Sequence, residues 1–120
     1  MVIIIYEERI EDKHTVSHII RGVKVVGHAD RADVCVAVST VMQTVGAYLM
    51  EEGYDKAFNR SHEEVLLNAL VEMTVFDESE DDLPGIMLDY LTSSLFALAS
   101  QFNIKWERKQ WLPRSDTEEQ

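Results

Sequence analysis

Blocks of apolar residues along the chain predict strands and helices in alternation. Residues 2–6 (VIIIY) form a continuous β-branched run, which is typical of a buried strand. A charged, turn-like segment follows, and residues 14–26 predict a second, longer strand in which Gly22 is a candidate bulge position. The two runs therefore predict an antiparallel pair whose far end delivers Gly27 and His28.

The next block has helical periodicity. Apolar residues recur at three- and four-residue spacing over residues 31–52, which predicts an amphipathic helix. Asp30 or Asp33 is expected to cap its start, and Gly53 is placed to end it. The predicted apolar face consists of Val34, Val38, Val41, Val45, Tyr48 and Leu49.

The middle of the chain is harder to assign. Residues 54–64 are polar and fit no single element. Residues 65–76 predict one strand or one hairpin arm, whereas a capping box from Ser61 to Glu64 favours a short helix over residues 61–70 instead. Residues 77–82 hold five acids and predict a solvated loop, because they lack the alternation and the glycine of a calcium-binding loop.

A second helix and a last strand complete the pattern. Pro84 suits the first turn of a helix and Asn103 suits its end, and residues 104–111 alternate as a half-exposed strand does. Together the blocks predict one α+β domain over residues 1–112, a small mixed or antiparallel β-sheet with two helices in the order β-β-α-β-α-β. Residues 113–120 are expected to be a flexible tail. The second apolar stripe is Leu88, Leu91, Leu95, Leu98 and Phe102.

The charge balance limits the classes of partner. The 120 residues include 22 acids and 11 lysines and arginines, which gives a formal net charge of −11. A nucleic-acid backbone is excluded as the main partner, because its binders need a basic surface. The negative charge would attract a basic polypeptide by electrostatic steering. Alternatively, it only keeps the protein soluble.

The single cysteine and the short apolar runs indicate a compartment. One cysteine cannot form an internal disulfide. The run at residues 2–6 is too short for a signal-peptide core, and we expect no stretch long enough to span a membrane. These features predict a cytoplasmic protein that keeps Cys35 as a free thiol and has no membrane partner.

His28 and Cys35 form the main candidate site. A short loop after a strand brings that strand's end close to the next helix start, and a neighbouring histidine can generate the reactive thiolate. The first turn of a helix also favours an anion and offers free N–H groups as an oxyanion hole. The alternatives are a buried cysteine that acts as a small hydrophobe and a histidine that satisfies a loop carbonyl.

Two further residues are candidates for a supporting role. Ser39 lies one helical turn after Cys35, on the same face, where its hydroxyl can bond the thiolate, the substrate or a carbonyl of its own helix. Asp33 can orient His28 or cap the helix. The remaining histidines are His14 and His18, expected on one face of the second strand, and His62. They show no recognisable zinc-ligand spacing with Cys35, so we expect neither a metal nor a cofactor.

This region resembles a known family. Gly-His-Ala, an acidic residue and then Val-Cys-Val-Ala-Val-Ser is similar to the signature of the ribosomal-processing cysteine proteases, small bacterial enzymes, and the order of elements over residues 1–109 is similar too. The chain departs from the pattern in a shorter, glycine-free loop at residues 30–34 and in Asp33, which lies two residues before the cysteine rather than three. The direct matches are Gly27, His28, Ala29, Cys35, Ala37, Val38 and Ser39.

The resemblance implies an activity and a kind of partner. Members of this family remove the N-terminal extension of a large-subunit ribosomal protein and act as homodimers. It therefore implies a thiol protease with a catalytic dyad of His28 and Cys35, and a basic polypeptide substrate that is either a ribosomal protein precursor or a phage protein. The alternative is a non-catalytic, acidic, dimeric protein-binding module of the same fold.

Overall fold

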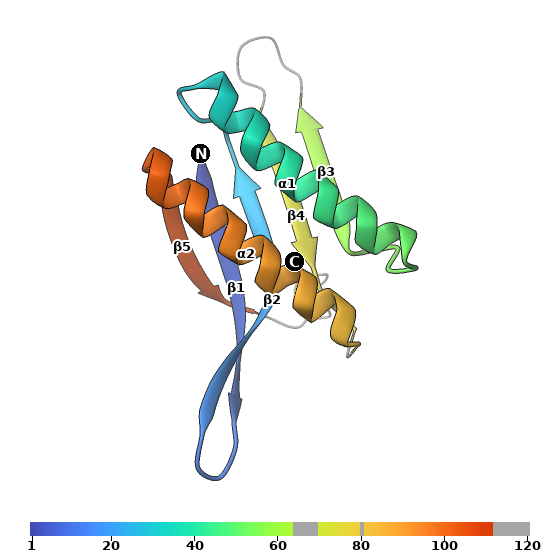
Figure 1. Ribbon diagram of the computed structural model, residues 1–120. Coiled ribbons are helices and arrows are strands. Elements are labelled where there is room, and N and C mark those ends of the chain that lie inside the picture. The colour runs from blue at the N-terminus through green and yellow to red at the C-terminus, as the bar shows by residue number, and fades with distance from the viewer. Residues whose placement is uncertain (64–69, 80, 112–120) are drawn as a thin grey trace.

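In this computed structural model, two helices cover one face of a five-stranded sheet (Figure 1). The structure describes residues 1–63, 70–79 and 81–111. The helices are α1 (Ala32–Glu51) and α2 (Asp82–Phe102). The strands are β1 (Val2–Glu11), β2 (Val16–Val26), β3 (Phe58–Glu63), β4 (Leu70–Phe76) and β5 (Lys105–Gln110), in the spatial order β3-β4-β2-β1-β5.

The sheet is mixed, which confirms the predicted α+β class. β1 pairs antiparallel with β2, β2 with β4 and β3 with β4, while β5 runs parallel to β1 at the edge. The β1–β2 hairpin is longer than expected, and its far half extends away from the helices (Figure 1). Tyr6 lies opposite Gly22 and Glu7 opposite Ile20, so Arg21 is the extra residue of a bulge at the position that Gly22 indicated.

Between the helices the chain forms two strands, one more than the predicted order contains. β4 confirms a hairpin arm ending near residue 76, and β3 is its partner. The short helix over residues 61–70 is wrong at its start, because Ser61 to Glu63 belong to β3. The polar sequence of β3 carries no strand signal of its own, and pairing with β4 imposes its conformation. Residues 64–69 and the expected tail at 113–120 lie outside the described residues.

At the helix ends, the predicted cap of α1 is wrong, whereas the predicted ends of α1 and α2 are confirmed. Arg31 is the N-cap of α1 and makes no side-chain capping bond, so neither Asp30 nor Asp33 caps it. Gly53, at φ +100°, follows the end of α1 as predicted. Asn103 ends α2 in the left-handed conformation, at φ +55°.

The core lies between the helices and the sheet. The buried stripe of α1 is rotated slightly from the predicted one, because Met42 is buried whereas Tyr48 is 41% exposed. From the sheet, Ile3, Ile5, Val23, Val25, Met73 and Val75 meet Val34, Val38, Met42, Val45 and Leu49 of α1 and Leu88, Leu91, Leu95 and Ala99 of α2.

Both helices are long and apolar enough, by length and composition, to cross a membrane. The expectation that no stretch reaches that length was therefore wrong. Each helix nevertheless contributes a buried stripe to the core beside the sheet, and a core helix of a globular domain passes the same test of length and composition.

Candidate active site at the start of α1

A glycine turn directs the chain from β2 toward α1. Gly27 has φ +85°, a conformation that costs little only for glycine. A Cβ atom on Gly27 would also lie 3.7 Å from the backbone of Met1. The ammonium group of Met1 donates a hydrogen bond to the carbonyl oxygen of His28 at 2.8 Å. The start of β1 therefore holds the loop that presents His28.

Cys35 is the fourth residue of α1 and is half-buried. The backbone N–H of Ala29 donates to its Sγ at 3.1 Å, and the thiol lies 3.7 Å from the carbonyl oxygen of the same residue. The Cys35 N–H donates to the carbonyl of Arg31 at 3.3 Å. The sulfur therefore lies between the helix start and the loop that follows His28.

A cavity of about 310 Å³ opens at this sulfur. It brings together four of the predicted site residues, Gly27, His28, Cys35 and Ser39, whose catalytic roles remain predictions. The other lining residues come from the N-terminus, β2, α1, β3 and β4: Met1, Val25, Val36, Thr40, Gln43, Arg60 and Met73.

Ser39 is available to a ligand in this cavity. Its hydroxyl makes no hydrogen bond with any residue that the structure describes. One alternative for Ser39 was a hydrogen bond to a carbonyl of its own helix, one turn earlier. The neighbouring Thr40 makes a bond of this kind, to the carbonyl of Val36 at 2.7 Å, but Ser39 does not. The Ser39 hydroxyl therefore remains a candidate to bond the thiolate or a substrate.

Asp33 lies outside the cavity lining and points to other partners. Its carboxylate accepts hydrogen bonds from the Arg31 guanidinium at 2.6 and 3.1 Å and from the Val34 N–H at 3.0 Å. With the Cys35 N–H also bonded, two donors expected for the oxyanion hole are occupied. The donor that meets the sulfur is the Ala29 N–H.

Two polar residues of the cavity were not predicted from the sequence. Gln43 lies two helical turns after Cys35 and one after Ser39, so their shared four-residue spacing was the signal that could have found it. Arg60 comes from β3, and no sequence signal placed that segment beside α1. None of the lining residues that the structure describes is acidic.

A second cavity of about 520 Å³ lies on the other side of the same loop. Met1 and His28 line both cavities. The remaining lining comes from the loop, the start of α1 and the segment joining α2 to β5, where the Arg31 guanidinium lies 5.5 Å from the centre of the Phe102 ring.

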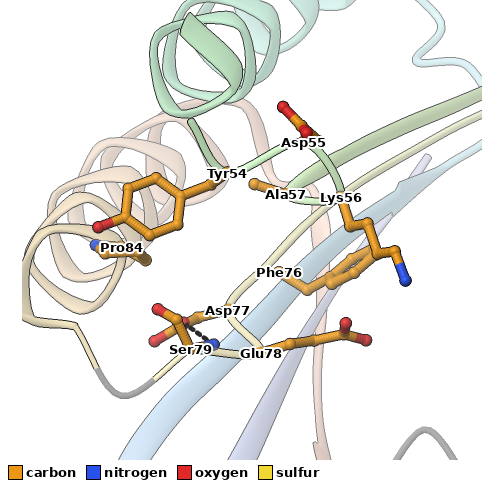
Figure 2. Close-up of a pocket in the computed structure, with 9 residues that line it drawn as sticks. All are labelled: Tyr54, Asp55, Lys56, Ala57, Phe76, Asp77, Glu78, Ser79 and Pro84. Atoms are coloured by element: carbon orange, nitrogen blue, oxygen red, sulfur yellow. Dashed lines mark hydrogen bonds between the residues drawn. The ribbon is translucent and has the colours of Figure 1, made fainter. Parts of the chain in front are cut away.

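A third cavity, of about 250 Å³, is lined by residues 54–57, 76–79 and 84 (Figure 2). One of its acids, Asp77, is engaged within the fold. Buried Asp77 accepts hydrogen bonds from Ser79 and from Arg21. The Tyr54 hydroxyl donates to Asp81 at 2.9 Å, which raises the pKa of Tyr54. The described lining of this cavity contains neither a cysteine nor a histidine.

Two of the other histidines, His14 and His18, lie on the β1–β2 hairpin and do not line the Cys35 cavity. His14 lies in the turn between β1 and β2 rather than in a strand as expected, and His18 faces Glu7 with 3.7 Å between Nδ1 and Oε2. Within residues 1–63, 70–79 and 81–111, no group of three or more histidine, cysteine or acidic side chains could hold a metal ion.

Comparison with solved structures shows what this fold is similar to. It is similar to the ribosomal processing protease Prp from S. aureus in complex with a covalently linked product peptide, with a TM-score of 0.58 and 15% identity over 90% of this chain and 98% of that one. It is also similar to SMU.848 from Streptococcus mutans, with a TM-score of 0.64 and 13% identity over 92% and 94% of the two chains.

A further S. aureus Prp structure, in complex with a substrate peptide, gives a TM-score of 0.53 and 13% identity over 91% of this chain and 99% of that one. Neither the family models nor the curated proteins compared with this sequence give a match. At such low identity the likeness concerns the fold. It confirms, at that level, the resemblance to the ribosomal-processing proteases that the sequence indicated.

Proposed function

We propose that this protein is a cysteine endopeptidase in which Cys35 is the nucleophile and His28 the general base. The observation that carries the proposal is that both residues line one cavity, while the backbone N–H of Ala29, the residue after His28, donates to Cys35 Sγ at 3.1 Å. A nucleophile, a base and a fixed donor are the parts that acyl transfer requires. The likeness of the fold to Prp supports the proposal.

The reaction follows from these positions. His28 takes the proton of the Cys35 thiol, and the thiolate attacks the carbonyl carbon of a peptide bond. In the tetrahedral intermediate, the negatively charged oxygen and Sγ are bonded to the same carbon atom. The Ala29 N–H lies close to the sulfur and is therefore placed to stabilise this oxyanion. His28 then protonates the leaving amine, and water hydrolyses the thioester.

The substrate in this proposal is a polypeptide. The two cavities that share His28 offer room for a chain on both sides of the cleaved bond, and the net charge of −11 would attract a basic protein. By analogy with Prp, we propose a ribosomal protein precursor or a phage protein as substrate. A cytoplasmic homodimer completes the proposal.

Digestion of a proteome-derived peptide library tests the activity. Wild-type protein should produce new peptide ends, and Cys35→Ala and Cys35→Ser should produce none. Ser93→Ala, an exposed substitution on α2, should cleave like the wild type. Cleavage that survives in Cys35→Ala would show that the mechanism is wrong.

One observation favours the alternative of a non-catalytic binding module. The Cys35 thiol makes hydrogen bonds to both the N–H and the carbonyl of Ala29, as a satisfied structural cysteine does. In that case a basic peptide should bind without being cleaved, and iodoacetamide should modify Cys35 slowly at neutral pH.

A further inference from the structure

The cavity at Cys35 differs in charge from the molecule around it. The protein carries a net charge of −11, yet none of the described residues that line this cavity is an aspartate or glutamate. Its ionisable lining groups are the Cys35 thiol itself, His28, Arg60 and the ammonium group of Met1. At physiological salt, interactions between exposed charges are screened beyond about 8–10 Å. A ligand in this cavity therefore interacts more strongly with these groups than with acids elsewhere on the surface.

Arg60 differs from the other arginines that the structure describes, because it contacts no described carboxylate. Arg9, Arg21, Arg31 and Arg108 each contact a carboxylate. The exposed side chain of Arg60 contacts none among the residues that the structure describes. Arg60 lies on β3 opposite Met73 of β4, which also lines the cavity. A guanidinium group without a carboxylate partner, in the cavity that Cys35 also lines, can bind a carboxylate of a ligand with two parallel hydrogen bonds.

We infer that Arg60 binds a carboxylate of the substrate close to the bond that is cleaved. This inference rests on the proposed function and adds a specificity to it. The ligand is a peptide whose carboxylate belongs either to an aspartate or glutamate side chain or to a nearby C-terminus. The acidic surface of the whole protein steers a basic chain, whereas Arg60 recognises one acidic group on that chain.

Two alkylating reagents of different charge test the local field at Cys35. The ratio of the rates with anionic iodoacetate and neutral iodoacetamide is measured on the same thiol, so it can be obtained whether Cys35 reacts quickly or slowly. Loss of one positive charge in Arg60→Gln should lower this ratio about two- to three-fold, and Arg60→Glu should lower it further. Arg108→Gln, on exposed β5, should leave it unchanged.

An unchanged ratio in Arg60→Glu would overturn the inference and leave the proposed protease activity standing. In a different outcome, Cys35 reacts more slowly than a model thiol with both reagents, but the ratio of rates still depends on Arg60. That result would contradict the proposed protease activity and support the binding of an anion by Arg60. The two failures are therefore distinguishable.

Paired peptides then identify the source of the carboxylate. For a peptide cleaved by the wild type, replacing the acidic residue nearest the cut by its amide should raise KM several-fold in the wild type and have little effect in Arg60→Gln. If amidation of the peptide C-terminus has that effect instead, the carboxylate is terminal. Arg60→Lys should keep part of the preference. If the wild type cleaves the acidic peptide, its side-chain amide and its C-terminal amide equally, the inference is overturned.

Discussion

At the residue scale, the peptide group of Ala29 connects the loop to Cys35, the proposed nucleophile. Its N–H lies 3.1 Å from the Cys35 sulfur, whereas the N–H groups of Val34 and Cys35 are bonded elsewhere. The motif placed His28 and Cys35 correctly in one cavity, since a short loop must bring a strand end and a helix start together. It could not reveal the Ala29 donor or the pairing of Asp33 with Arg31, because these depend on loop conformation and rotamers.

Removal of the Ala29 N–H tests its role as an oxyanion donor. Ala29→Pro lacks this hydrogen-bond donor, and we expect peptide cleavage to fall about 100- to 1,000-fold, the usual loss for one such donor. Ala29→Gly keeps the N–H and should retain most of the activity. Circular dichroism checks that both variants are folded, and full activity in a folded Ala29→Pro would refute this role.

At the element scale, the close contact of α1 with β3 forms one wall of the cavity. Gly46 of α1 lies against the Phe58 ring, and a Cβ atom there would be 2.9 Å from Phe58 Cβ and closer still to the ring. This contact places Arg60, two residues after Phe58, beside the α1 residues of the site. The helices and the β1–β2 pair were predictable from their periodicity, but β3 was not, because its polar residues follow no period and its partner strand determines its conformation.

Two matched glycine substitutions test that contact. Alanine favours a helix over glycine, yet Gly46→Ala should lower the free energy of unfolding by about 1–3 kcal/mol, because the methyl group overlaps Phe58. Gly85→Ala, in the first turns of α2 with nothing within 4 Å of its added Cβ atom, should instead raise it by about 0.5–1 kcal/mol. Urea unfolding measures both, and a stabilising Gly46→Ala would show that α1 and β3 are less closely packed.

At the scale of the whole molecule, the fold places all candidate chemistry at one end of the sheet. The loop after β2, the start of α1, the start of β1 and part of β3 meet there, while the acids near Tyr54 and Asp77 stabilise a different part of the structure. Total charge was readable from composition, but the charge of the cavity was not, since it depends on which elements the sheet order brings together.

The central claim is that His28 activates Cys35, and the rate of Cys35 alkylation by iodoacetamide at pH 7 tests it most directly. The comparison needs the wild type, His28→Ala and, as a control, His14→Ala in the distant β1–β2 turn. If His28 activates Cys35, the wild-type rate should be well above that of N-acetylcysteine, fall about tenfold or more in His28→Ala, and stay unchanged in His14→Ala. A wild-type rate below that of the model thiol, unaffected by His28→Ala, would contradict the account and identify Cys35 as a structural cysteine of a binding module.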